Sequence, residues 1–212
     1  MVLSMIPWWV WAALGVVALL KLFVVVMSNP KVKGRIGEMR VSWSLRSELG
    51  EGYEILNDVY MPSMEGETTQ IDHIVVSPYG IFVIETKNWT GWIFGDAKSA
   101  KWTQSVYRKK NSFQNPIRQN YKHICELSRN LGIDKGYFIS VIAVTGDCTF
   151  KTDIPEGVVY SKRAAEYIRS FTRWLIKPEQ VPEIVSAILE WQASIPPSVK
   201  ASHVSNLRRR NS

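Results

Sequence analysis

Cysteine is scarce in this chain: there are two, Cys125 and Cys148, among 212 residues, and they form no C-x-x-C pair. A disulfide framework or a cysteine-based zinc ribbon needs more cysteines at closer spacing, so both are excluded. We expect the two cysteines to be buried free thiols in a reducing compartment. The chain also lacks a glycine-rich phosphate loop of the P-loop type, which argues against nucleotide-driven work.

Acidic and histidine side chains are few relative to basic ones. The chain carries three histidines, 19 aspartates and glutamates, and 26 lysines and arginines, for a formal net charge of +7. This excess favours an anionic partner, either nucleic acid or an anionic membrane surface, although a membrane protein also retains positive charge on its cytoplasmic side. Apolar residues make up 46% and charged residues 21%, which indicates a folded protein rather than a disordered one.

A long apolar run occupies residues 5–27, with Lys21 as its single charged residue. A helix rises about 1.5 Å per residue, so this run can span the roughly 30 Å hydrocarbon layer and predicts a transmembrane helix. Trp8, Trp9 and Trp11 stand near its start, and tryptophan favours the membrane–water interface. A cleaved signal peptide is the competing interpretation, but no Lys or Arg precedes Lys21 and no clear small-residue cleavage site follows.

Basic side chains follow the apolar run and also close the chain. Lys31, Lys33 and Arg35 come directly after the run, while the residues before it carry no charged side chain. The positive-inside rule then predicts a single-pass membrane protein with its N-terminus outside and its C-terminal bulk in the cytoplasm. Residues 198–212 include three consecutive arginines and are expected to form a disordered tail near anionic lipid or nucleic acid.

The rest of the chain alternates helix-like and strand-like segments. The expected helices cover residues 34–49, 116–131, 161–175 and 182–195, and the expected strands cover 53–60, a hairpin over 70–89, then 90–96 and 138–144. This order predicts an α/β fold, a parallel or mixed β-sheet with helices packed on it. The expected organisation is a transmembrane helix at 5–27, an α/β domain at 31–160, a C-terminal helical extension at 161–197 and the tail at 198–212.

The central hairpin, residues 70–89, is the most informative part of the sequence. Two β-branched runs flank Ser-Pro-Tyr-Gly at residues 77–80, which predicts a tight turn between antiparallel strands. A tight turn places Val76 opposite Ile81. Because side chains alternate between the two faces of a strand, this register then fixes which polar residues share a face.

Four polar residues of the hairpin would share one face. Counting outward from the turn puts Asp72 opposite Glu85 and Gln70 opposite Lys87. Cross-strand Cβ atoms lie roughly 5 Å apart, where like charges repel, and the flanking residues are apolar. A divalent cation held by Asp72 and Glu85 would offset that repulsion, so we expect a Mg²⁺ site, with Mn²⁺ as an alternative. A plain salt-bridged surface patch is the other interpretation.

These groups suit the hydrolysis of a phosphodiester bond. Lys87 could orient or help deprotonate a water on the metal, or neutralise charge growing on a phosphate oxygen. Glu38, from the helix at 34–49, could approach as an outer ligand, although a glutamate in a first helical turn also has an ordinary electrostatic explanation. Gln70 could hold the water or the phosphate across from Lys87. His73 points away from Asp72 by strand alternation, and we expect no histidine to act as the general base.

A basic and aromatic stretch follows the hairpin. Its basic residues are Lys98, Lys101, Arg108, Lys109 and Lys110, interleaved with Trp102 and Tyr107. Such a mixture suits phosphate contact combined with base stacking. A solvated face with a few buried aromatic residues is the alternative.

The order of several short motifs resembles the nuclease-related domain family, part of the restriction-endonuclease-like group with an Asp…Glu-x-Lys active site. The motifs are Gly37-Glu38, Gln70-Ile71-Asp72, Glu85-Thr86-Lys87-Asn88-Trp89, Trp102-Thr103-Gln104 and Asn115-Pro116-Ile117-Arg118-Gln119. The resemblance covers roughly residues 33–160. It implies a mixed four- or five-stranded sheet flanked by helices, magnesium dependence and cleavage of nucleic acid, DNA first of all.

The resemblance also assigns roles to individual residues. It implies that Asp72 and Glu85 are metal ligands and that Lys87 is the catalytic lysine, with Glu38 matching the acidic residue that the family carries on a helix. Gln119 resembles a glutamine that touches substrate in some relatives, and with Gln70, Lys101 and Arg118 it completes the expected substrate contacts.

The expected function is a membrane-anchored, metal-dependent nuclease facing the cytoplasm. The alternatives are a non-catalytic nucleic-acid-binding module held at the membrane and a membrane scaffold that recognises a protein partner through the C-terminal helices.

Overall fold

The computed structural model describes residues 7–63 and 68–196, and the predicted tail at 198–212 lies outside the described residues. The chain divides into two compact units, Met1–Ile36 and Gly37–Ser212. The first unit contains α1 (Trp8–Ser28), a 21-residue helix with no buried residue. Its length and composition are sufficient to cross a membrane, a criterion that a signal sequence also meets.

Helix α2 (Pro30–Glu48) begins four residues earlier than the sequence predicted. The Asn29 side chain accepts a hydrogen bond from the backbone N–H of Lys31 (2.9 Å), which caps the helix start. Pro30 follows in the first turn, where a proline loses no intrahelical hydrogen bond. The helix runs on into the second unit, where Val41 and Leu45 are fully buried.

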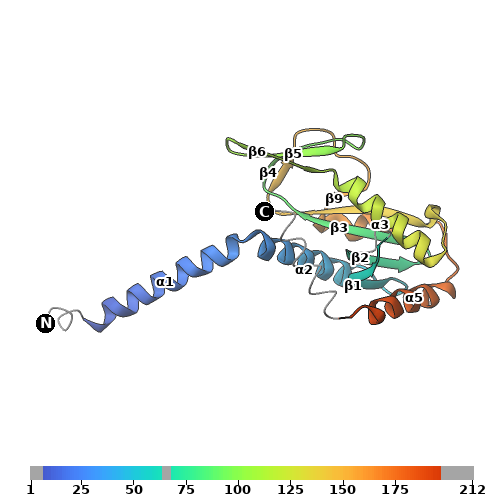
Figure 1. Ribbon diagram of the computed structural model, residues 1–212, viewed down its shortest axis with the longest axis horizontal. Helices are drawn as coiled ribbons and strands as arrows, with labels where there is room; N and C mark the ends of the chain where they lie inside the picture. Colours follow the sequence, from blue (N-terminus) through green and yellow to red (C-terminus); the bar gives the residue numbers. More distant parts are fainter. Residues whose placement is uncertain (1–6, 64–67, 197–212) are drawn as a thin grey trace. The chain divides into compact units, whose positions relative to one another are not determined.

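The second unit is built on a five-stranded mixed sheet, as the sequence predicted (Figure 1). Its order is β1-β2-β3-β7-β9, antiparallel from β1 to β3 and parallel from β3 to β9. Val76 lies opposite Ile81 across the β2–β3 hairpin, which confirms the predicted register. The strands are β1 (Glu54–Pro62), β2 (Thr68–Ser77), β3 (Gly80–Asn88), β7 (Phe138–Thr145) and β9 (Val158–Tyr160).

Helices cover both faces of this sheet. Val83 and its neighbours on one face pack against α3 (Pro116–Leu131) and α5 (Gln180–Ser194). Phe82 and Ile84, on the other face, pack against α2 and the short helix α4 (Ala164–Arg169). Burial on both sides explains why the strand sequences are continuous apolar runs rather than alternating ones.

Helix α3 has the bounds that the sequence predicted. The Asn115 side chain accepts a hydrogen bond from the Ile117 backbone N–H (2.9 Å), and Pro116 occupies the first turn. Gly132 ends the helix in the left-handed conformation (φ 66°). A 3-10 turn, Lys135–Tyr137, then leads into β7.

The helix predicted over residues 161–175 is present only in its first part. A 3-10 turn (Ser161–Arg163) leads into α4, which ends at Arg169. The backbone N–H groups of Leu175 and Ile176 both donate to the Pro78 carbonyl at the β2–β3 turn (2.8 and 3.0 Å). These tertiary hydrogen bonds hold the segment against the hairpin and replace the bonds that a continuing helix would make.

A second, four-stranded sheet was not predicted. It has the order β6-β5-β4-β8 and lies at the top of Figure 1. Trp102 on β5 is buried beside Trp89 and donates its indole N–H to the Asp96 carbonyl (2.8 Å). Its strands are β4 (Gly91–Phe94), β5 (Lys101–Val106), β6 (Lys109–Gln114) and β8 (Cys148–Phe150).

Both cysteines are free, as predicted; Cys148 is buried, whereas Cys125 is only partly buried, contrary to the prediction.

Candidate active site

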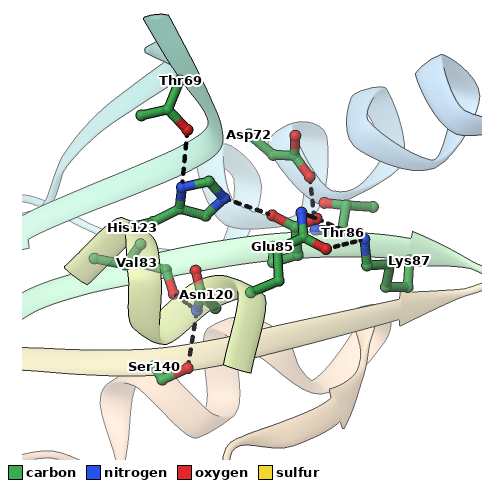
Figure 2. A network of polar contacts seen from close by, with 10 residues as sticks. Thr69, Asp72, Val83, Glu85, Thr86, Lys87, Asn120, His123 and Ser140 are labelled. Atoms are coloured by element: carbon green, nitrogen blue, oxygen red, sulfur yellow. Dashed lines mark hydrogen bonds and ion pairs between the residues drawn. The ribbon is translucent and has the colours of Figure 1, made fainter. Parts of the chain in front are cut away.

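Asp72 and Glu85 lie where the β2–β3 ladder ends. The last paired residues are His73 and Ile84, one position nearer the turn. Beyond them, the Asp72 Oδ2 atom accepts a hydrogen bond from the Thr86 backbone N–H (2.7 Å), as Figure 2 shows. The carboxylate therefore satisfies a strand N–H at the point where backbone pairing stops.

Glu85, Lys87 and Gln119 form a closed triangle of hydrogen bonds. The Lys87 ammonium donates to Glu85 Oε1 (2.7 Å) and to Gln119 Oε1 (2.9 Å). The Gln119 amide nitrogen donates to the same Glu85 oxygen (2.7 Å). Glu85 is only 5% exposed, whereas Lys87 keeps partial access to solvent. Helix α3 thus fixes the lysine against the carboxylate of its own strand.

His123 approaches the other oxygen of Glu85, a contact that the sequence analysis did not foresee. Its Nε2 atom lies 3.6 Å from Glu85 Oε2. This distance is short enough for an ionic interaction but too long for a hydrogen bond. Its Nδ1 atom hydrogen-bonds the Thr69 hydroxyl (3.2 Å). The signal was in the sequence: His123 stands four residues after Gln119, which puts both side chains on one face of α3.

The two carboxyl groups differ in their electrostatic environments. Burial, followed by repulsion from Glu85, raises the pKa of Asp72 well above its usual range; the Thr86 hydrogen bond and Lys87 only partly oppose this. Burial alone would raise the pKa of Glu85 too, but Lys87 and His123 outweigh it and lower that pKa to about 2. Glu85 is thus held ionised, while Asp72 favours a bound proton or a bound cation.

Of the four remaining predicted site residues, Glu38 interacts electrostatically with Asp72, and the other three have different partners or are exposed. The charge of Glu38, on α2, contributes to raising the pKa of Asp72, so it lies within electrostatic reach. The Gln70 amide donates to Asp58 Oδ1 (3.0 Å) rather than facing Lys87. Arg118 and Lys101 lie by the second sheet. Arg118 donates to the Lys98 carbonyl (2.7 Å), and Lys101 is exposed at the start of β5.

His73 has a structural environment, in agreement with the strand alternation that turned it from Asp72. It is buried, and its Nδ1 atom contacts the Asn57 side-chain oxygen at 2.7 Å. Burial lowers the pKa of His73 to about 4, against a smaller opposing effect of Glu85. The ring is therefore neutral at physiological pH, and it forms a hydrogen bond that links β2 to β1.

The donor set fits a magnesium ion in its chemistry. No group of three His, Cys, Asp or Glu side chains is preassembled around one point among residues 7–63 and 68–196. Magnesium, however, is commonly held by one or two carboxylates and keeps several of its waters. The second Asp72 oxygen points away from Thr86 (Figure 2). Burial is the main cause of the raised pKa of Asp72, and the charges of Glu85 and Glu38, which a cation would offset, add to it.

Comparisons with known proteins identify the family of the chain. The chain is 39% identical, over 164 residues, to an uncharacterised protein of Bacillus anthracis. The aligned region covers 76% of this chain and 77% of the relative. No solved structure matches the chain significantly. The family model described as "Nuclease-related domain" matches residues 33–145, more than half of the chain and the part that carries Glu38, Asp72, Glu85, Lys87 and Gln119. The chain therefore belongs to the nuclease-related domain family, which is placed among the restriction-endonuclease-like proteins.

Proposed function

We propose that this protein is a membrane-anchored nuclease that uses magnesium to hydrolyse phosphodiester bonds of nucleic acid, DNA first of all, on the cytoplasmic side. The observation that carries the proposal is the convergence of Asp72, Glu85 and Lys87 at the open end of the β2–β3 hairpin. Membership of a nuclease-related family supports the same reaction class.

Asp72 and Glu85 would hold the metal, which when bound supplies Lewis-acid stabilisation of charge on the phosphate. Lys87 would act on the phosphate or the attacking water directly. An ammonium group has three N–H donors, and the contacts with Glu85 and Gln119 use two of them. The third is available to a phosphate oxygen, whose negative charge grows as water attacks phosphorus and the bond to the leaving oxygen breaks.

Gln119 is assigned a positioning role in this scheme. Its amide group contacts both Glu85 and Lys87, so it holds the ammonium in one orientation. Glu38 would act from α2 through its charge, by adding to the negative field around Asp72 that favours cation binding.

The test uses the full chain in neutral-lipid nanodiscs. Supercoiled plasmid, linear duplex, single-stranded DNA and RNA are incubated with Mg²⁺, Mn²⁺ or chelator. Lys87→Met is expected to lower the cleavage rate about 10²- to 10³-fold, the usual effect of removing one donor to a developing oxyanion, and Asp72→Asn is expected to abolish metal-dependent cutting.

Matched controls are Lys177→Met and Asp134→Asn, which change exposed residues far in the sequence from strands β2 and β3. Asparagine can still cap the turn that Asp134 caps, so this variant keeps its fold. Cutting that survives in both Asp72→Asn and Lys87→Met would refute the assignment. Salt-sensitive binding with no cutting in any metal would instead indicate the tethered nucleic-acid-binding module.

A further inference from the structure

The second sheet exposes aromatic and polar groups that the proposed chemistry does not use. Trp92 on β4 is 54% exposed, and Tyr107 at the β5–β6 turn is 100% exposed. Both line a hollow of about 720 Å³ between β4, the end of β5 and the segment that enters β8, here called the β4–β5 hollow. Its size lies within the range of small-ligand sites.

Tyr107 has a backbone conformation that is energetically unfavourable for a tyrosine. Its φ angle is +52°, in the left-handed region that a bulky side chain adopts only at a cost. Because the side chain is fully exposed, no burial offsets that cost. Asparagine or glycine would fit this turn better, so the tyrosine ring points to a contact outside the chain.

Charge is divided between the hollow and its surroundings. Arg108, Lys109 and Lys110 are exposed directly after Tyr107, and the Lys151 ammonium lies 4.7 Å from the centroid of the Trp92 ring. Among the residues that line the hollow the charged one is Asp147, which would repel a phosphate. The hollow itself therefore suits an uncharged ring with hydrogen-bond donors, and the surrounding cations suit phosphates.

The hollow stands next to the candidate active site along the chain. Thr90 lines it and follows Lys87 by three residues, so their Cα atoms are at most about 11 Å apart. One edge of the hollow is therefore near Lys87 along the chain, which permits a single strand to contact both.

We propose that the β4–β5 hollow binds one unpaired base of the strand being cut, and that it selects bases with an exocyclic amine. The base stacks on Trp92 and Tyr107, its amine donates to the Asp147 carboxylate, and the cations around the hollow hold the flanking phosphates. Cytosine, adenine and guanine carry such an amine and thymine does not. The inference rests on the proposed function in one respect: it takes the phosphate beside this base to be the one at Lys87.

The test measures binding without cutting. The full chain in neutral-lipid nanodiscs, in chelator, is titrated into dye-labelled oligo(dC), oligo(dT) and duplex DNA, with fluorescence anisotropy as the readout. Wild type is expected to bind oligo(dC) about tenfold more tightly than oligo(dT), the effect of one hydrogen bond to a charged group. Asp147→Ala, which removes the side-chain acceptor, is expected to remove that difference.

Two aromatic variants test the stacking. Trp92→Ala and Tyr107→Asn are each expected to weaken oligo(dC) binding about 5- to 100-fold, the range for stacking one base, and to leave duplex binding unchanged. Tyr107→Asn also relieves the backbone strain, so its loss of binding cannot come from unfolding. The matched control is Tyr121→Ala, an exposed α3 ring (55%) with the Lys135 ammonium at 5.8 Å, which is expected to bind as wild type does.

The outcomes separate this inference from the nuclease assignment when cleavage in Mg²⁺ is measured in parallel. If wild type cuts DNA while Trp92→Ala and Tyr107→Asn bind oligo(dC) as tightly as it does, the base subsite is refuted and the nuclease stands. If binding follows expectation but no cutting occurs in any metal, the subsite stands and the nuclease proposal fails. A preference for oligo(dC) that persists in Asp147→Ala overturns the selection of the amine.

Discussion

At the scale of single residues, the role assigned to Gln119 differs most between the sequence and the structure. The resemblance implied a substrate contact, yet both ends of its amide are engaged with Glu85 and Lys87. A glutamine that binds substrate mainly affects KM, whereas one that orients the catalytic ammonium mainly affects kcat. The two roles are therefore separable by kinetics.

We expect Gln119→Leu to lower kcat about 10- to 100-fold with a small change in KM, because supporting contacts of catalytic groups have effects of this size. Steady-state cleavage across a range of DNA concentrations, with DNA in excess over protein, gives both constants. Gln114→Leu, a change at an exposed position on β6, serves as the control and should leave kcat unaltered. A rise in KM at constant kcat in Gln119→Leu would restore the substrate-contact role.

The proximity of Asp72 and Glu85 could be predicted from the sequence because a two-residue turn fixes the register of a hairpin. The contact of His123 with Glu85 could not be predicted in the same way, since it depends on how α3 packs across the sheet. Gln70 shows the limit of the alternation argument: the argument gives the face of the strand, but the amide then bonded Asp58 on the neighbouring strand β1.

At the scale of elements, the position of α2 depends on Gly37. A Cβ atom there would lie 2.7 Å from the Thr145 hydroxyl oxygen and 3.4 Å from the Asn88 Cβ atom, at the ends of β7 and β3. The helix can approach those strand ends because this residue has no side chain. Glu38 is the next residue, so the same close approach brings its charge within reach of Asp72.

We expect Gly37→Ala to lower the free energy of unfolding by about 1–3 kcal/mol, because overpacking forces the helix or Thr145 to shift. The cleavage rate should fall as well, since Glu38 moves with α2. Gly34→Ala is the matched control: a Cβ atom there meets nothing within 4 Å, so it should be neutral or stabilising by up to about 1 kcal/mol. Denaturant unfolding of both variants in detergent checks this. Equal effects of the two changes would show that helix propensity, not packing, governs the position.

Elements also explain why part of the fold was missed. The main sheet could be predicted because its strands are apolar runs buried on both faces. Strand β6 is polar and almost wholly exposed, and its basic residues indicated a solvated stretch as readily as a strand. It is ordered by pairing with β5, whose Trp102 packs into the core beneath it, and single-sequence periodicity does not report such pairing.

At the scale of the whole molecule, α1 decides where the activity would operate. The helix meets the length and composition needed to span a membrane, and Lys31, Lys33 and Arg35 follow it. A retained anchor and a cleaved signal sequence place the nuclease domain on opposite sides of the membrane. The proposed function on cytoplasmic nucleic acid requires the anchor with its C-terminal side inside.

We expect the chain expressed in bacteria to stay in the membrane after alkaline carbonate extraction, with an intact mass that includes α1. A tag at the N-terminus should be digested by protease added to spheroplasts, while a C-terminal tag stays protected until lysis. Changing Lys31, Lys33 and Arg35 together to Glu should reduce this asymmetry, because charges next to the span set its direction. The control is the same change at Lys109, Lys110 and Lys151, far from the span in sequence, which should keep the orientation. A mature chain that has lost α1 would place the domain outside the cytoplasm. Cytoplasmic DNA could then not be its substrate.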